Sequence, residues 1–357
     1  MSQPISLFDF ECRARELLSK SAFEYFASGA GAEITLRENR EAYDSLRLRP
    51  RVLVPVTNRD MSIELFGQRL ATPIIVAPMA FQKMAHPEGE LATARACSAA
   101  GATMVASTVA TCSIEEIAAA SNCPKFFQLY VFKDRGVTRS LVERAEAAGY
   151  SAIEMTADVP VMGRREADIR NHFSLPEWLS VKNLEAAGHG CMVSDGAESG
   201  PALYTRYLFD ADLSWPIVEW LRSVTKLPIL VKGVLRGDDA VRAVDHGAGG
   251  VIVSNHGGRQ LDTVLPTIRA LPEVVDAVGG RCPVIVDGGI RKGIDIIKAI
   301  ALGASAVQVG RPILWGLAVD GEAGATRVLT LLREEFDNAL ALCGCPSIAH
   351  VTRDLVA

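Results

Sequence analysis

Short apolar runs recur along the chain, and segments with helical periodicity separate them. Runs of this length, rich in residues that favour strands, predict buried parallel strands. The eight predicted strands are Ile74–Ala77, Thr103–Ser107, Phe126–Tyr130, Ala152–Thr156, Ile229–Lys232, Gly250–Ser254, Val284–Asp287 and Ala306–Gly310. Amphipathic patterns between the strands predict helices, among them Glu88–Ala99, Thr138–Ala148, Asp238–Asp245 and Ile294–Ala301.

Eight strands that alternate with helices predict an α/β fold, a closed parallel TIM (β/α)8 barrel. Most connections span roughly the 20–30 residues that one β-loop-α-loop unit requires. The alternative is a doubly wound sheet. That alternative is weakened because Pro78-Met79-Ala80-Phe81 follows the first strand, where a dinucleotide-binding sheet would carry Gly-x-Gly-x-x-Gly.

Two stretches do not fit the regular alternation. Residues 1–72 precede the first strand and contain two predicted helices, Leu7–Ser19 and Ala22–Phe26, so we expect an N-terminal helical extension. About seventy residues separate the fourth and fifth strands, including a Gly-, Ser- and Ala-rich segment at 188–201. We expect one domain over 1–357, with the barrel at 73–357 and a lid-like loop after strand 4 at about 160–225.

The composition is that of an ordinary globular protein, with 49% hydrophobic and 22% charged residues. A formal net charge of −5 argues against nucleic acid as a partner. No apolar stretch approaches the roughly 18 residues of a membrane span, and we expect no membrane association. The first ten residues lack a secretory pattern, and Asp354-Leu355-Val356-Ala357 is not a peroxisomal address. We therefore expect a cytoplasmic enzyme of bacterial type.

The eight cysteines show no Cys-x-x-Cys spacing, and Cys343-Gly344-Cys345 is the only close pair. Two such residues do not make a zinc site, so we expect free thiols in a reducing compartment and no metal.

Polar residues gather where the predicted strands end. Active sites of TIM barrels lie at this carboxyl-terminal face, so the pattern predicts an enzyme. The residues at or just beyond strand ends are Ser107, Gln128, Tyr130, Thr156, Asp158, Lys232, Ser254, His256, Asp287, Gly310 and Arg311.

The segment Ser254-Asn255-His256-Gly257-Gly258-Arg259-Gln260 is the most informative of these strand ends. His256 can accept a proton near neutral pH, and Arg259 offers a planar fork for a carboxylate. Asp158 can orient His256, and Arg165 can supply a second grip on the carboxylate. The segment therefore predicts a site that binds a small acid and deprotonates it.

Two glycine- and arginine-containing loops follow the last two strands: Asp287-Gly288-Gly289-Ile290-Arg291 and Gly310-Arg311. Barrels often bind phosphate in these loops, so we expect a phosphate-bearing cofactor; the alternative is tight turns with surface arginines. Lys232 at the end of its strand would meet an electron-rich ring or a phosphate. A Schiff-base lysine and an ion pair with a barrel carboxylate remain the alternatives for it.

These residues bear a family resemblance. The chain resembles the FMN-dependent α-hydroxy-acid oxidases, the group of glycolate oxidase and lactate oxidase, in order from about residue 5 to the end. The matching segments are the 254–260 signature, Gln82–Glu90, Gln128-Leu129-Tyr130, Asp287–Arg291 and Gly310-Arg311-Pro312.

The resemblance implies FMN at the barrel mouth, oxidation of an (S)-2-hydroxy acid to a 2-oxo acid, reduction of O2 to H2O2, and a homo-tetramer. His256 would be the base, Asp158 its partner, Arg165 and Arg259 the carboxylate clamps, and Tyr25 and Tyr130 substrate ligands. The residues implied at the cofactor are Pro78, Met79, Ala80, Ser107, Gln128, Thr156, Lys232, Ser254, Asp287, Gly288, Gly289, Arg291, Gly310 and Arg311.

The substrate pocket departs from the glycolate oxidase pattern. Val109 stands where glycolate oxidases typically carry tryptophan, and Met162 where leucine is common; Phe81 and Tyr204 would complete the apolar wall. A smaller and more adaptable wall favours L-lactate or a bulkier acid such as mandelate over glycolate.

The same-family alternative is a dehydrogenase that passes electrons to a quinone or cytochrome. More remote alternatives are a phosphate-ligand-binding barrel without redox chemistry and a Schiff-base aldolase that uses Lys232.

Overall fold

A computed structural model of the protein describes residues 4–357; residues 1–3 of the predicted N-terminal extension lie outside the described residues. Eight parallel strands close into a barrel in the order β10-β3-β4-β5-β6-β7-β8-β9. This confirms the predicted fold class. The barrel strands are β3 (Ile74–Val76), β4 (Thr103–Ser107), β5 (Lys125–Leu129), β6 (Ile153–Thr156), β7 (Ile229–Val234), β8 (Gly250–Val253), β9 (Val284–Val286) and β10 (Ala306–Val309).

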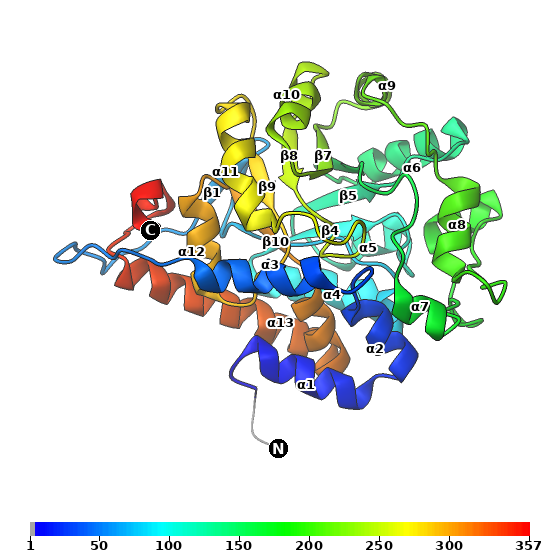
Figure 1. Cartoon of the computed structure of the whole chain (residues 1–357), viewed down its shortest axis with the longest axis horizontal. Helices are drawn as coiled ribbons and strands as arrows, with labels where there is room; N and C mark the ends of the chain where they lie inside the picture. Colours follow the sequence, from blue (N-terminus) through cyan, green and yellow to red (C-terminus); the bar gives the residue numbers. More distant parts are fainter. Residues whose placement is uncertain (1–3) are drawn as a thin grey trace.

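Helices follow the strands and form the outer layer of the barrel (Figure 1). The predicted helices are present within a few residues of their expected bounds. The helices between barrel strands are α4 (Gly89–Ala100), α5 (Ile114–Ala120), α6 (Arg135–Ala147), α10 (Gly237–Asp245), α11 (Thr267–Val278) and α12 (Gly293–Ala301). Local signals fix several starts: Ser113 caps α5 in a capping box with Glu116, and Asp134 caps α6.

The N-terminal extension contains α1 (Leu7–Leu17), α2 (Lys20–Ala27) and α3 (Ile34–Ser45), followed by a hairpin of β1 (Ile63–Leu65) and β2 (Gln68–Leu70). The hairpin closes the amino-terminal end of the barrel, because its Leu65 and Leu70 belong to the same apolar cluster as the inward-facing Ile75 and Leu230. Phe66 at the hairpin tip packs edge-on against Phe126, 5.6 Å between ring centroids. One end of the barrel is thus sealed, and a ligand can enter only at the other.

The final helix α13 (Arg311–Leu342) packs against α1, α4 and α12. It is broken at Asp320 and Gly321, where the backbone leaves helical geometry. The chain ends in two short 3-10 helices, η3 (Ile348–His350) and η4 (Arg353–Leu355). A further 3-10 helix, η1 (Gln82–Met84), follows the first barrel strand.

A long connection follows β6, the fourth barrel strand, and carries its own helices. These are α7 (Glu166–Arg170), η2 (Lys182–Ala187), α8 (Gly200–Leu208) and α9 (Pro216–Val224). Backbone bonds tie it to the barrel, because the amide of Lys133 donates to the carbonyl of Leu208 and Phe132 forms a bridge with Phe209. The connection therefore lies over the side of the barrel mouth (Figure 1).

Among the described residues, no helix combines the length and the apolar composition that crossing a membrane requires.

Candidate active site

A deep cavity of about 1240 Å³, open space at its mouth included, lies at the carboxyl-terminal ends of the barrel strands. All the residues predicted for the site line this cavity except Asp158 and Ser254, which lie behind it. The lining residues that were predicted are Tyr25, Pro78, Met79, Ala80, Phe81, Ser107, Val109, Gln128, Tyr130, Thr156, Met162, Arg165, Tyr204, Lys232, His256, Arg259, Asp287, Gly288, Gly289, Arg291, Gly310 and Arg311.

The imidazole of His256 is paired with Asp158: Nδ1 lies 3.0 Å from Oδ1 of the carboxylate. Burial, together with the positive charges of Lys232 and Arg165, lowers the pKa of His256 below its usual value against the opposing effect of Asp158. Burial alone would raise the pKa of Asp158, but His256 and Lys232 outweigh it and lower the pKa overall. Near neutral pH the pair is therefore a neutral imidazole and a carboxylate, and Nε2 is free to accept a proton.

The turn that carries His256 has an unusual backbone. His256 has φ of 57°, in the left-handed region, and Gly257 and Gly258 follow with φ of 65° and 75°. A Cβ at Gly258 would lie 2.8 Å from the backbone of Leu36 in α3, so that position requires glycine. The backbone amide of His256 donates to Oγ of Ser254 at 3.1 Å, which holds the turn against the end of β8. Such local strain is typical of functional sites.

Two guanidinium groups line the cavity with His256. Arg259 donates to the backbone carbonyls of Tyr25 and Ser28, and its guanidinium lies 5.1 Å from the centre of the Tyr25 ring. Nε of Arg165 donates to the carbonyl of Arg259 at 3.3 Å, which places the two side chains together. Burial and the neighbouring Arg165 lower the pKa of Arg259 to about 10, so it stays cationic at neutral pH. Two neighbouring guanidinium groups of this kind can bind a carboxylate.

Lys232 belongs to a buried cluster of polar side chains that also contains Ser254 and Asp287. Its Nζ lies 3.1 Å from Oδ2 of Asp287 and donates to Oγ of Ser254 at 2.8 Å, and Ser254 donates to the same carboxylate oxygen at 2.9 Å. Burial opposes the charged form of Lys232, but Asp287, Asp158 and Glu154 outweigh burial and raise its pKa. The ion pair with a barrel carboxylate is thus present. A Schiff-base role is disfavoured because it needs a neutral amine.

The loops after β9 and β10 place two further arginines against the cavity. Arg311 donates to the carbonyls of Phe26, Ser28 and Gly257, and Arg291 donates to the carbonyl of Ile290. Within residues 4–357 neither guanidinium has an ion pair with a carboxylate. Burial lowers the pKa of both arginines. Two cations that line the cavity and lack an ion pair among the described residues suit an anionic group.

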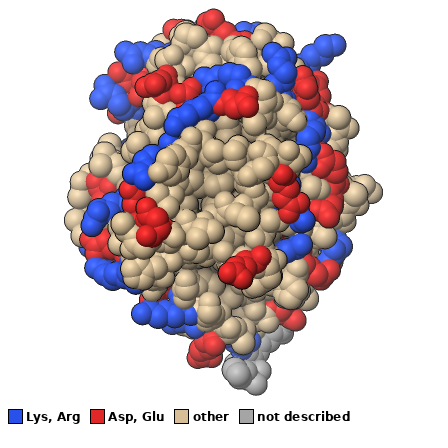
Figure 2. Space-filling model, turned by 90° about the vertical axis from the view of Figure 1, so that its right-hand side faces the viewer, with Lys and Arg blue, Asp and Glu red and all other residues tan. Residues whose placement is uncertain are grey.

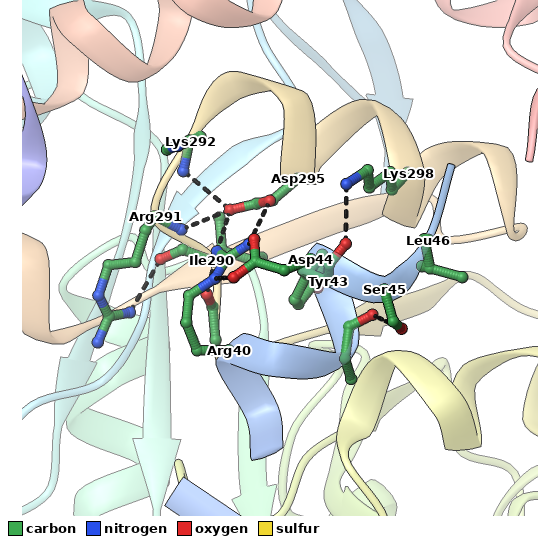
Figure 3. Close-up of polar contacts among 12 residues, drawn as sticks. Arg40, Tyr43, Asp44, Ser45, Leu46, Ile290, Arg291, Lys292, Asp295 and Lys298 are labelled. Carbon is green, nitrogen blue, oxygen red and sulfur yellow. Dashed lines mark hydrogen bonds and ion pairs between the residues drawn. The ribbon is translucent and has the colours of Figure 1, made fainter. Parts of the chain in front are cut away.

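The backbone of the first of these loops is fixed by the start of α12. Figure 3 shows that the carboxylate of Asp295 binds Arg40 and accepts from the backbone amides of Arg291 and Lys292. The carboxylate therefore holds the main chain of the loop and leaves the Arg291 side chain directed elsewhere. Gly289 is required there, because a Cβ would lie 2.1 Å from the carbonyl oxygen of Asn39.

Three of the residues expected near a flavin ring form a hydrogen-bonded row at the ends of β4, β5 and β6. Oγ of Ser107 donates to Oε1 of Gln128 at 3.1 Å, and Nε2 of Gln128 donates to Oγ1 of Thr156 at 3.0 Å. The row fixes the orientation of the Gln128 amide beside the cavity.

The chain matches the model of the FMN-dependent dehydrogenase family over residues 14–357. The protein belongs to the FMN-dependent dehydrogenase family. This confirms the family and the cofactor, FMN, that the sequence led us to expect. The chain is 50% identical to an L-lactate oxidase of Nostoc sp. over 98% of its own length and 97% of the relative's. It is 52% identical to glycolate oxidase 3 of Arabidopsis thaliana, over 98% and 94%.

A crystal structure of mandelate oxidase with (S)-4-hydroxymandelic acid superimposes on this member of the FMN-dependent dehydrogenase family with a TM-score of 0.95. The two chains are 46% identical, and the match covers 99% of this chain and 98% of that one.

The cavity has the features that FMN requires. The cationic Arg291 and Arg311 fit a phosphate. Oδ1 of Asp287 is a buried acceptor without a protein partner in the described residues, and a hydroxyl group of the ribityl chain can donate a hydrogen bond to it. Lys232, which lines the same cavity, would supply a positive charge beside the ring.

Several lining residues of this family member were not predicted from the sequence. Met192, Pro201, Thr205 and Phe209 come from the long connection, where no sequence pattern marked them. Phe209 stacks on Tyr130, with 4.5 Å between ring centroids. Gln308 also lines the cavity, and its signal was present: it is the polar residue of the otherwise apolar β10.

Proposed function

We propose that the protein is an FMN-dependent oxidase that converts an (S)-2-hydroxy acid to its 2-oxo acid and reduces O2 to H2O2. The observation that carries the proposal is the placement of the His256–Asp158 pair beside the Arg165 and Arg259 guanidinium groups on one cavity. Arg165 and Arg259 bind the substrate carboxylate. The neutral imidazole of His256 then accepts a proton from the 2-hydroxy acid that they hold.

The residues of the site have separate roles in the reaction. Arg165 and Arg259 fix the carboxylate. His256 accepts the proton at Nε2, and Asp158 then stabilises the imidazolium that results. Tyr130 serves as a neutral hydroxyl donor to the substrate, because burial, reinforced by Asp158, raises its pKa to about 12. Tyr25 faces the same cavity for the same purpose.

Bound FMN supplies the two-electron acceptor. Arg291 and Arg311 would hold its phosphate, with Gly288, Gly289 and Gly310 allowing close approach. Lys232 would stabilise negative charge on the ring. Ser254 would act through Lys232 and Asp287, to which it is hydrogen-bonded. The residues that would contact the ring are Pro78, Met79, Ala80, Ser107, Gln128 and Thr156.

We propose L-lactate or a bulkier acid such as mandelate as substrate in preference to glycolate. Val109 and Met162 line the cavity together with Phe81 and Tyr204, so the wall is apolar and one of its members is small. The Tyr204 hydroxyl donates to the carbonyl of His189 at 2.8 Å. The Tyr204 ring packs edge-on against Phe209. The likeness to mandelate oxidase supports this choice.

We further propose that the enzyme acts in the cytoplasm as a homo-tetramer. The side of the molecule on which α7 and α8 lie supports an interface, because its centre consists of uncharged residues with charged residues around them (Figure 2). Trp178, Val193 and Tyr207 of the connection after β6 are large and exposed. Exposed apolar surface of this kind marks contact sites between proteins. The connection would then serve as a lid near the interface.

The experiment that tests the proposal is a peroxide assay on the FMN-loaded protein with L-lactate, (S)-mandelate and glycolate. The proposal requires stoichiometric peroxide and 2-oxo acid, with the highest kcat/KM for lactate or mandelate. Oxidation that needs an added quinone and releases no peroxide would replace the oxidase with a dehydrogenase.

A further inference from the structure

A hydrogen bond crosses the inside of the barrel beneath the cavity. Nε2 of Gln308 donates to Oε2 of Glu154 at 2.6 Å. Glu154 lies on β6 and Gln308 on β10, and these strands are four places apart in the closed order of eight, so they face one another. Both side chains are buried, with 0% and 1% of their surface exposed. Neither residue has a part in the proposed reaction.

The pair separates the apolar end of the barrel from the polar end. Side chains alternate along a strand, so Ala152, Glu154 and Thr156 share the inward face of β6. Ala152 belongs to the apolar interior cluster, and Thr156 lines the cavity. Glu154 is therefore one layer below the cavity floor. Gln308 reaches from this layer to the cavity itself.

The carboxyl group of Glu154 is not fully partnered. Its Oε1 is buried and has no hydrogen-bond partner among the described residues, and the same holds for Oε1 of Gln308. A buried carboxylate with one oxygen unpaired is costly, and protonation at that oxygen removes the charge. Burial raises the pKa of Glu154 to about 7, with Lys232 and Gln308 opposing the rise.

The charged groups that face Glu154 are Lys232 on β7, Asp287 after β9 and Asp158 after β6. Lys232 is in direct contact with Asp287, so its charge is already paired. The group therefore holds more carboxylates than cations, and Glu154 has no cation in contact with it among the described residues. Further negative charge in the cavity above would favour its protonated form.

We propose that Glu154 is a proton-binding residue that couples the reduction potential of the bound cofactor to pH. The inference rests on the proposed function in one respect, that FMN occupies the cavity. Reduction adds two electrons and one proton to the ring and leaves it with negative charge. The Glu154 carboxylate then takes one further proton from solvent at Oε1, and the resulting acid releases it when the ring is reoxidised. Glu154 acts through the electric field and touches no reacting atom.

The test is the midpoint potential of the FMN-loaded protein between acidic and alkaline pH, compared with Glu154→Gln. At acidic pH both proteins carry a neutral residue 154, and the two potentials coincide. As pH rises, the wild-type midpoint potential falls below that of the variant. One further proton per two electrons adds about 30 mV per pH unit to the wild-type slope, which is a tenfold change in the equilibrium constant. Parallel curves for the two proteins would overturn the proposal.

A second variant keeps the test decisive if Glu154→Gln does not fold. Gln308→Met removes the donor to the ionised carboxylate, so the steeper region must move to higher pH. An unmoved region would also overturn the proposal. The control is Glu90→Gln, which neutralises another buried carboxylate, bonded to Thr111 outside the cavity, and must leave the curve unchanged.

The outcomes separate the two levels of the account. A protein that does not bind FMN contradicts the proposed function. Bound FMN whose potential follows the same pH dependence with and without Glu154 contradicts only the role of Glu154.

Discussion

Nδ1 of His256 lies 3.0 Å from Oδ1 of Asp158, although 98 positions separate the two residues in the chain. The contact fixes which nitrogen carries the proton and leaves Nε2 toward the cavity. It converts two strand-end residues into a unit that can accept a proton and stabilise the charge that follows.

Removing the imidazole tests this unit. His256→Ala should retain bound FMN and lose roughly 10²–10⁴-fold in kcat, the usual contribution of a positioned general base. Steady-state rates and the visible spectrum measure the two effects. His350→Ala, at an exposed histidine far along the chain, is the control and should keep its rate. A near-normal rate in His256→Ala would remove the residue from the base role.

The pH dependence follows from the same pair. Burial holds the pKa of His256 below its ordinary value of 6.5, so the base is neutral above that lowered pKa and protonated beneath it. The value of kcat/KM should therefore fall as pH decreases, with a midpoint under pH 6.5. Asp158→Asn removes a group that raises the pKa of His256, and should move the midpoint lower and reduce kcat. An acidic limb above pH 6.5, or one that Asp158→Asn leaves in place, speaks against the assignment.

The carboxylate clamp gives a binding phenotype. Arg165→Met removes one charged hydrogen-bonding partner, which is worth about 1.5–3 kcal/mol, so KM should rise roughly tenfold to a hundredfold. Arg170→Met, at an exposed arginine of α7 paired with Glu166, is the matched control. Kinetics with the acid and with its amide should show the loss for the acid alone; an equal loss for both would exclude a carboxylate contact.

Val109 tests the choice of substrate. Val109→Trp narrows the pocket, and kcat/KM for mandelate relative to glycolate should fall by about tenfold or more, the effect of a few carbon atoms in an apolar pocket. Val109→Ala, the opposite change at the same position, should leave the preference for the larger acid in place. If neither substitution alters the ratio, Val109 does not contact the substituent.

The phosphate site predicts a cofactor phenotype. Arg291→Leu removes a cation that lines the cavity and has no ion pair in the described residues, and the dissociation constant of FMN should rise about tenfold to a hundredfold. Flavin fluorescence during titration of the apoprotein measures it. Arg281→Leu, at a part-exposed arginine paired with Asp245, should bind FMN normally. A similar loss of affinity for riboflavin, which has no phosphate, would place Arg291 elsewhere.

Much of the fold and of the site could be predicted because both depend on local pattern. Barrel strands are short, mostly apolar runs, and their polar ends must converge at one face, which is why His256, Lys232 and Asp287 were expected together. The phosphate loops carried glycine and arginine at fixed positions after strands.

Other features depend on packing between distant segments and left no local signal. Helix α3 begins at Ile34, and the N-cap residue Glu33 has a left-handed backbone and makes no side-chain cap, so no start was visible. Asn39 of that helix exchanges two side-chain hydrogen bonds with Asn255, a contact that only the closed barrel creates. The Glu154–Gln308 bond likewise requires knowing which strands face one another.

The most direct test of the central claim is an anaerobic visible spectrum of the FMN-loaded protein, titrated with L-lactate, (S)-mandelate and glycolate and then opened to air. We predict that lactate or mandelate bleaches the flavin band, that air restores it with release of peroxide, and that His256→Ala keeps the band and is not bleached. A protein that cannot be loaded with FMN, or a flavin that none of the three acids reduces, would contradict the account.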